Sequence, residues 1–285
     1  MGARHHWILA AAFAWLVSSS ALVGVSMPQP SSASVSRGGV ARAATAARID
    51  VRVYFLRREH IAVAHRSVPW TKAVASAAMR ALLSGPSAGE RAIGLTTTIP
   101  SRTGLLGVEI EHGTATVDLS RRFASGGGSL SMMARLAQVT FTLTQFSTVQ
   151  RVRFELDGVA VHVFGGEGIL LDHPVTRATY ESLSPAILIE RPGRAWAVRS
   201  PLRVSGTANV FEAQFSLELT DAAGRVLARR RVHASAGTGT RGSFDVRIAF
   251  SVRSAQAGTL IAFDNSPKDG SRIDVVEVPL RLRNS

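Results

Sequence analysis

The hydrophobic pattern of the chain changes character near residue 185. Over residues 49–173, stretches of alternating apolar and polar positions, typical of strands, are mixed with stretches whose apolar positions recur every three or four residues, typical of helices. Beyond residue 185, short alternating stretches follow one another about every ten residues, and we find no helical pattern. The pattern therefore predicts two folded regions.

The first region is predicted to combine helices with hairpins of strands. Residues 49–55 alternate as a strand with one buried face, and residues 62–68 are expected to return as its partner. A helical pattern then begins at Trp70. It is expected to end at the candidate structural motif Gly85-Pro86, because glycine can adopt a left-handed conformation and proline cannot continue the helix. The other expected elements are a hairpin of residues 105–111 and 114–119, a helix from an N-cap at Ser129 to about Phe146, and a closing hairpin of residues 149–156 and 159–164. Because helices and hairpins are segregated along the chain, an α+β fold is predicted.

The second region is predicted to be an all-β sandwich. The expected strands are residues 187–189, 202–208, 211–219, 226–232, 242–250, 258–263 and 274–282. Six or seven short strands in about 100 residues are typical of this architecture. Residues 176–184 have no strong periodicity, so we expect a domain at 44–175, a linker at 176–184 and a second domain at 185–285.

The first 43 residues are predicted to be a signal peptide followed by a flexible leader. Arg4 precedes the apolar run 7–17, and the following stretch is rich in Pro, Ser, Ala and Gly. Cleavage sites are available after Ala33 and after Ala43. The alternative is an uncleaved membrane anchor over residues 7–25, near the length of about 20 that a membrane helix needs. We favour cleavage and an extracytoplasmic, secreted or envelope-associated protein.

Composition adds charge to this picture. The chain has 33 basic and 20 acidic residues, a net charge of +13, and only Lys72 and Lys268 are lysines. A GC-rich genome produces such an arginine excess without selection; the functional alternative is attraction to a polyanion. Outside the cytoplasm this points to an anionic cell-wall polymer, with membrane contact only if the N-terminal segment stays uncleaved. Nucleic acid is disfavoured, because aromatic and basic residues do not alternate.

Several segments of the first region resemble the GerMN domain family of sporulation and germination proteins. They are Val51–Phe55, Leu82–Pro86, Ile99-Pro100, Val117–Ser120, Leu136–Thr144 and Phe154–Gly158. The resemblance implies a compact α+β domain, similar to ring-building modules of secretion systems, non-enzymatic and used in envelope assemblies. Many such proteins are lipoproteins, whereas this chain has no cysteine to acylate. Anchoring by a lipid on cysteine is therefore excluded.

Segments of the second region resemble the immunoglobulin-like domain of bacterial spore-germination proteins. They are Ser200–Leu202, Val204–Gly206, Thr207–Glu212, Gly242–Phe244, Ser266–Gly270 and Val278-Pro279. This resemblance implies a sandwich for cell-surface interaction and names no catalytic residue. The two resemblances occur in the order in which these domains often follow one another.

Three acidic residues of the first region are candidates for chemistry. Asp118, Glu155 and Asp157 fall on neighbouring predicted strands, and paired carboxylates cleave glycosides when they are held about 5–9.5 Å apart in a cleft. The structural alternative is that Asp157 and Gly158 form a turn and Asp118 ends a strand. We favour this alternative.

Polar loop residues of the second region are candidates for interaction. Asn209 and Glu212 flank Phe211 at a strand junction, where they are expected to hydrogen-bond loop backbone, with ligand contact as the alternative. A further candidate turn contains Pro267, Asp269 and Gly270. Its proline interrupts the spacing of oxygen ligands that a calcium loop needs, so we expect no calcium there.

Motifs for metal, nucleotide and nucleophilic chemistry are weak. No two histidines after the leader have the spacing of a zinc site, and the absence of cysteine removes thiolate ligands and nucleophiles. Residues 237–242 satisfy G-x-G-x-x-G but open no helix, so a hairpin loop is predicted. We expect no catalytic residue, no metal and no cofactor.

The sequence as a whole predicts an exported, non-catalytic envelope protein that binds or scaffolds at the membrane or wall. Its expected partners are envelope proteins or an anionic cell-wall polymer, and the family resemblance links it with sporulation or germination. Two alternatives are a cell-wall glycan hydrolase that uses the paired carboxylates and a subunit of a homo-oligomeric ring.

Overall fold

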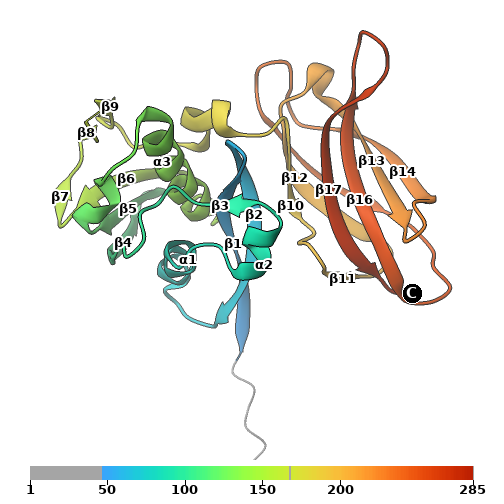
Figure 1. Cartoon of the computed structure of the whole chain (residues 1–285), viewed down its shortest axis with the longest axis horizontal. Helices are drawn as coiled ribbons and strands as arrows, with labels where there is room; N and C mark the ends of the chain where they lie inside the picture. Colours follow the sequence, from blue (N-terminus) through green and yellow to red (C-terminus); the bar gives the residue numbers. More distant parts are fainter. Residues whose placement is uncertain (1–46, 167, 285) are drawn as a thin grey trace, which may run out of the picture. The chain divides into compact units, whose positions relative to one another are not determined.

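The computed structural model describes residues 47–166 and 168–284 (Figure 1). The predicted signal peptide and its cleavage sites lie outside the described residues. Within the described part of the chain, no helix has both the length and the apolar character needed to cross a membrane.

The first region contains two main sheets. One has the order β2-β1-β3, formed by β1 (Arg48–Arg57), β2 (His60–Pro69) and β3 (Leu95–Thr96). The other has the order β4-β5-β6-β7, formed by β4 (Leu105–Glu111), β5 (Thr114–Leu119), β6 (Arg151–Leu156) and β7 (Val159–Ala160). A small ribbon of β8 (Val163–Phe164) and β9 (Ile169–Leu170) follows. The predicted hairpins β1–β2 and β4–β5 are antiparallel pairs, as the alternating pattern requires.

Helices of the first region differ in detail from the periodic pattern. Helix α1 (Val74–Leu83) begins four residues after Trp70, whose side chain is 61% exposed. The short helix α2 (Ala88–Ala92) is capped at its N-terminus by a capping box between Ser87 and Glu90. The long helix α3 (Ser129–Leu143) has Gly128, not Ser129, at its N-cap position. The predicted N-cap at Ser129 is therefore wrong by one residue.

Helix α3 is buried around nearly its whole circumference rather than on one face. It contacts α1, β1, β6 and the later 3-10 helix η2, so each face meets another element. Its buried polar residues are Arg135, Gln138, Thr140 and Thr142. The Arg135 guanidinium is used locally, because it donates to the backbone carbonyls of Phe123 and Ser125. The helix also connects β5 to β6, which pair in parallel, so one crossover unit is embedded in the predicted α+β arrangement.

The segment expected to link the two regions is part of the first core. Residues Arg177–Leu183 form the 3-10 helix η2, and Tyr180 and Leu183 are buried with the side chains of α3 and β1. Leu188 of the following strand joins the same cluster. The chain therefore passes from the first core to the second within a few residues.

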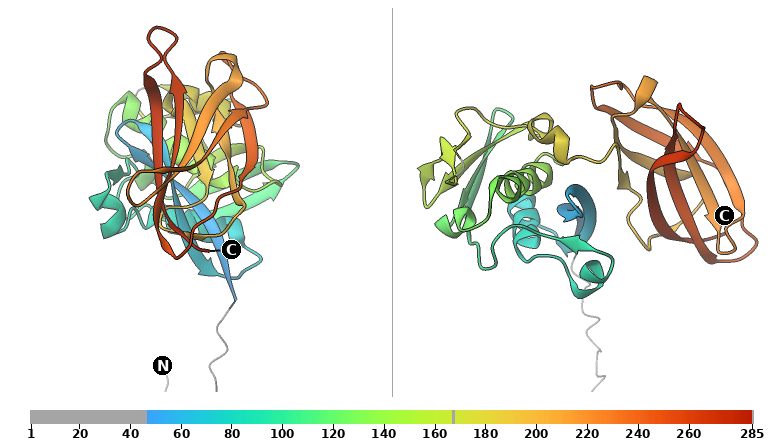
Figure 2. Two further views of the ribbon diagram at one scale, coloured as in Figure 1. Left: turned by 90° about the vertical axis from the view of Figure 1, so that its right-hand side faces the viewer. Right: turned by 45° about the horizontal axis from the view of Figure 1, so that its top comes forward.

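The second region is a two-sheet sandwich. One sheet has the order β10-β12-β15, formed by β10 (Ile187–Arg191), β12 (Leu202–Ala208) and β15 (Gly242–Ile248). The other has the order β11-β17-β16-β13-β14, formed by β11 (Ala197–Val198), β13 (Gln214–Asp221), β14 (Val226–His233), β16 (Gln256–Asn265) and β17 (Arg272–Leu282). Inward-facing side chains of both sheets form one core, and the sheets are seen as two layers in Figure 2. The predicted fold class, α+β followed by an immunoglobulin-like sandwich, is confirmed.

The G-x-G-x-x-G stretch lies between β14 and β15, which belong to different sheets, so it is a connection across the sandwich rather than a hairpin loop. A Cβ on Gly237 would lie 2.4 Å from the backbone nitrogen of Ala213, and one on Gly242 would lie 2.3 Å from that of Ala236. These two glycines are required by close backbone packing and not by a phosphate.

Candidate functional site

The acidic candidates of the first region lie together at the ends of β5 and β6. Asp118 and Glu155 are partners in the parallel register. The Asp118 carboxylate accepts a hydrogen bond from the Gly158 N–H at 3.0 Å, and Asp157, at φ 50°, accepts one from the Arg121 N–H at 3.2 Å. An ion pair of 3.1 Å joins Arg121 Nε to Asp157. These carboxylates therefore hold the turn after β6 against the end of β5.

The backbone carbonyls of the Gly85-Pro86 motif after α1 accept hydrogen bonds from arginine side chains. The Gly85 carbonyl accepts a hydrogen bond from Arg66 at 3.4 Å, and the Pro86 carbonyl accepts one from Arg91. Gly85 has φ 74°, so its left-handed conformation ends the helix as expected for glycine. These residues position α2 against β2.

Asn209, Phe211 and Glu212 lie at one end of the sandwich. The Asn209 side chain donates to the Glu181 carboxylate at 2.9 Å and accepts from the Gly239 N–H at 3.0 Å. Glu212 has φ 51° and its backbone N–H donates to Thr238 Oγ1 at 3.0 Å. Phe211 is 64% exposed at the rim of a shallow hollow. Thus the polar residues of this group order the loop and the aromatic ring is presented to solvent.

Pro267, Asp269 and Gly270 form the turn between β16 and β17. The Asp269 carboxylate accepts from the backbone N–H and the hydroxyl of Ser271, at 3.1 and 2.7 Å, and Gly270 has φ 73°. Within residues 47–166 and 168–284, no group of three or more acidic or histidine residues is arranged to hold a metal ion.

A buried ionic cluster that the sequence did not reveal surrounds Glu190 of β10. The Glu190 carboxylate is paired with Arg177 of η2 at 2.7 Å and with Arg52 of β1 at 3.3 Å. It also accepts the hydroxyl hydrogen bond of Tyr54, which is fully buried on β1. Arg177 lies over the rings of Tyr54 and Phe141, with its central carbon 5.1 and 4.7 Å from their centroids. This cluster joins the first region to the first strand of the second.

The ionisation of these groups follows from burial and charge. Burial alone would raise the pKa of Glu190, but Arg177 and Arg52 hold that pKa below its ordinary value. Burial is also the main reason why the pKa of the Tyr54 hydroxyl is raised, so tyrosine remains the proton donor. The cluster is thus a carboxylate shared by two guanidinium groups and a phenol.

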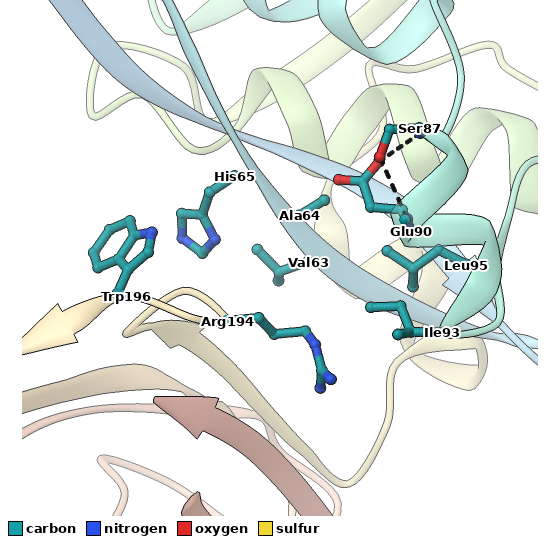
Figure 3. Close-up of a pocket in the computed structure, with 10 residues that line it drawn as sticks. Val63, Ala64, His65, Ser87, Glu90, Ile93, Leu95, Arg194 and Trp196 are labelled. Atoms are coloured by element: carbon teal, nitrogen blue, oxygen red, sulfur yellow. Dashed lines mark hydrogen bonds between the residues drawn. The ribbon is translucent and has the colours of Figure 1, made fainter. Parts of the chain in front are cut away.

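A pocket of about 390 Å³ lies beside this cluster (Figure 3). His65 of β2 and Trp196 form one side of it, in an edge-on contact with ring centroids 4.7 Å apart. His65 Nε2 lies 3.0 Å from the Glu190 carbonyl oxygen. Burial lowers the pKa of His65 to about 4, so the imidazole is neutral at pH 7 and its Nε2–H donates to that carbonyl. Gly193 allows this contact, because a Cβ there would lie 2.7 Å from both His65 Nδ1 and Trp196 Nε1.

The opposite side of the pocket combines a closed ion pair with apolar side chains. Glu90 of α2 is paired with Arg66 and receives the Ser87 backbone N–H at 2.7 Å. Burial opposes the charge of Glu90, but these hydrogen bonds hold its pKa below the ordinary value. Ile93 and Leu95 line the wall beside it. Glu90 is thus paired, whereas Arg194, which forms no ion pair with any described residue, extends along the pocket in Figure 3.

Sequence reasoning missed this group because its members are far apart in the chain. Tyr54 and Glu190 are separated by 136 positions, and His65 and Glu190 by 125. The available signals were local: a carboxylate within the otherwise apolar strand at Glu190, and a tryptophan directly after a Pro-Gly-Arg-Ala turn. None of the sequence-predicted site residues lines the pocket of Figure 3.

Solved structures similar to the chain include sporulation proteins. The first GerMN domain of the sporulation protein GerM from Bacillus subtilis is 21% identical, with a TM-score of 0.39, over 45% of this chain and 98% of that one. The tandem GerMN domains of the same protein are 15% identical, with a TM-score of 0.40, over 83% of this chain and 61% of that one. A putative lipoprotein from Clostridium perfringens is 20% identical, with a TM-score of 0.35, over 48% and 93%. A search of curated proteins gives no match.

Two family models match the chain in succession. The first, described as Germane, sporulation and spore germination, covers residues 52–162, from β1 to the end of the β6–β7 hairpin. The second, described as Gmad2, the immunoglobulin-like domain of bacterial spore germination, covers residues 186–271, from β10 to the turn before β17. The chain therefore joins a GerMN-type domain of the sporulation and spore germination family to an immunoglobulin-like domain of bacterial spore germination.

Proposed function

We propose that this chain is an exported, non-catalytic cell-envelope protein that binds or scaffolds at the outer face of the membrane or in the wall, in a process related to sporulation or germination. The observation that carries this proposal is the succession of two germination-associated domains in one chain. We further propose the domains of the sequence analysis, 44–175 and 185–285, with the intervening η2 packed on the core of the first.

The charge of the sandwich supports an anionic wall polymer as the partner. Strand β14 is an edge strand, and its three consecutive arginines Arg229, Arg230 and Arg231 are exposed. Arg229 is paired with the buried carboxylate of Glu218, whereas among the described residues the Arg230 guanidinium contacts only the Arg247 carbonyl, at 2.8 Å. An edge rich in cations also resists pairing with another strand, so its charge serves solubility as well as attraction.

Co-sedimentation with isolated cell-wall sacculi over a salt series tests the proposal. We expect the chain from Thr45 to Ser285, which forms one compact unit, to bind at low salt and to dissociate as the Debye length falls from about 10 Å at 0.1 M to about 3 Å at 1 M. The double variant Arg230→Gln/Arg231→Gln should weaken binding. Its matched control, Arg80→Gln/Arg253→Gln, removes two exposed charges elsewhere and should have a smaller effect. Absence of binding at low salt would contradict the proposal.

The hydrolase alternative has its own test. Asp118→Asn keeps an oxygen that accepts the Gly158 N–H, so the fold should be retained while any carboxylate chemistry is lost. We expect the wild-type chain to release no reducing ends from sacculi and the variant to bind them equally well. Hydrolysis by the wild type that disappears in Asp118→Asn would establish the alternative.

The ring alternative concerns assembly. Sedimentation velocity of the Thr45–Ser285 unit over a wide concentration range distinguishes a monomeric scaffold from a self-associating ring subunit. A monomer at all concentrations fits the scaffold proposal, and a closed oligomer would replace it by the ring.

A further inference from the structure

Two arginines near the pocket of Figure 3 have no carboxylate partner. Among the described residues, neither Arg57 at the end of β1 nor Arg194 before β11 forms an ion pair, in contrast with Arg52, Arg66 and Arg177 around them. Arg57 Nε is buried and has no hydrogen-bond partner. Arg194 has one long contact, from Nη1 to the Glu277 carbonyl oxygen at 3.4 Å. Burial makes an unused donor costly at Arg57, whereas Arg194 is exposed and its remaining donors are open to solvent or to a ligand.

These two cations act on each other. Burial is the main cause that lowers the pKa of Arg194, and the charge of Arg57 is the next. The Glu277 carboxylate acts in the opposite direction, but it follows Arg57 in importance and does not form an ion pair with Arg194. An anion bound near both guanidinium groups would relieve their repulsion.

Arg57 and Arg194 line a common pocket, together with the polar residues Arg58, His60 and Glu277 and a larger number of apolar residues. This second pocket has a volume of about 300 Å³ and includes side chains of Ile187 and Val276 from two strands of the sandwich. Arg194 and Val63 line both this pocket and the one that contains Trp196. The two pockets therefore adjoin at the Arg194 side chain, and together they offer paired cationic donors beside an apolar and aromatic surface.

The segment that carries Arg194 is fixed by its neighbours. The Ala195 N–H donates to the Pro279 carbonyl at 2.7 Å, and the Trp196 carbonyl accepts from the Arg281 N–H at 2.9 Å. Gly193 packs against the His65 ring at a distance that excludes a side chain. The backbone of the site is thus set before a ligand arrives, which reduces the ordering that binding requires.

We propose that this junction is a binding site for a small organic oxyanion, a carboxylate or a phosphate monoester, that carries an apolar body. Arg57 and Arg194 hold the oxyanion, and the apolar body lies against Val63 and Trp196. Guanidinium groups bind both kinds of oxyanion through paired N–H donors, so the experiment must distinguish them. The site is independent of the proposed wall binding, since it shares no residue with the arginines of β14.

Tryptophan fluorescence of the Thr45–Ser285 unit provides the test. In a Trp70→Phe background, Trp196 is the only tryptophan of that unit. We would titrate octanoate and octyl phosphate as the two anionic probes, octyl glucoside as a neutral probe with the same tail, and acetate and inorganic phosphate as anions without a tail. We expect saturable binding of octanoate, octyl phosphate or both, tighter than that of any of the other three. The probe that binds identifies the oxyanion.

Substitutions connect the signal to the site. Arg57→Met and Arg194→Met should each weaken binding by about tenfold or more, the loss expected for a charged hydrogen bond, while Arg194→Lys should retain part of it. Arg253→Met, which removes an exposed charge outside both pockets, should bind as the parent does. Circular dichroism of each variant checks the fold. Equal binding of octyl glucoside, or unchanged affinity in both methionine variants, would overturn the proposal.

Discussion

At the scale of single residues, the Glu190 carboxylate is the charge expected to contribute most to the stability of the fold. Its carboxylate is nine-tenths buried and compensates both Arg52 and Arg177. Removing one partner of a buried ionic group costs more than the pair contributes, because the remaining charges lose their compensation. We expect Glu190→Gln to lower the free energy of unfolding by roughly 3–5 kcal/mol.

Urea denaturation at pH 7 measures this loss. The matched control is Asp245→Asn, which breaks an exposed ion pair with Arg203 on β12 and should cost much less, because solvent screens the pair. Equal effects of the two substitutions would show that the cluster is not the stabilising feature described above.

His65 makes the stability depend on pH. Its pKa is lowered from 6.5 to about 4, chiefly by burial, so the unfolded chain takes up a proton in a range where the folded chain does not. Arg52 and Arg191 add to this effect, while the Glu190 carbonyl and Asp50 oppose it. Stability should therefore fall as the pH is lowered from about 6.5 to about 4, by roughly 1–3 kcal/mol from this residue.

The measurement is the free energy of unfolding at several pH values across that range. His65→Gln should flatten the slope between pH 6.5 and 5, where Glu190 remains ionised in both states. The matched control, His233→Gln, replaces the same residue type at an exposed position of β14. A wild-type stability that is constant down to pH 5 would contradict this interpretation of His65.

At the scale of elements, one glycine shows how tightly β10 and β12 approach each other. A Cβ on Gly206 would lie 2.0 Å from the Leu188 carbonyl oxygen, which is backbone and cannot move aside. We expect Gly206→Ala to lose more than about 2 kcal/mol of stability through disrupted pairing of the two strands. Gly89→Ala in α2 meets no atom within 4 Å and should be neutral or slightly stabilising, because alanine favours helices. Thermal unfolding of both variants compares them, and tolerance of Gly206→Ala would show that the strands separate easily.

Elements whose apolar residues recur at a regular spacing were predictable from the sequence. Elements that are very short, or whose buried residues show no such spacing, were not. The alternating pattern located β12 at its observed bounds, Leu202–Ala208, since one face of that strand is buried. It missed β11, because two residues carry no period. The segment at η2 was expected to be a linker because Tyr180 and Leu183 have no repeat around them, although both are buried. Pairing direction was also hidden, since the parallel register of β5 and β6 depends on where α3 returns the chain.

At the scale of the whole molecule, contacts between distant segments join the two regions. Arg241 of the sandwich is paired with Glu181 of η2 at 2.9 Å, and Glu190 is paired with β1 and η2. We therefore expect the Thr45–Ser285 unit to unfold in one calorimetric transition, with equal calorimetric and van't Hoff enthalpies.

The double variant Glu181→Gln/Glu190→Gln should resolve this transition into two, one for each core. Asp245→Asn, whose ion pair lies within a single sheet, should retain one transition. Two transitions in the wild type would show that the regions are thermodynamically separate.

The candidate site was predictable only where neighbouring strands formed it. Asp118 and Asp157 were expected near one another from adjacent strands, and they meet around the turn at Gly158. The pocket with His65 and Trp196 depends on packing between segments more than 100 positions apart, which a periodic pattern does not record. The unpartnered state of Arg57 likewise emerges only when every neighbouring carboxylate has been assigned.

The order of strands in the larger sandwich sheet has a consequence for synthesis. Strand β17 lies between β16 and β11, so β11 has no strand partner until residues 281 and 282 have been made. The backbone bonds that fix Ala195 and Trp196 also wait for residues 279 and 281. A chain truncated inside β17 would therefore keep the residues of the first core but lack the partners that fix Ala195 and Trp196. The pocket can therefore form only after residues 279–282 have been synthesised.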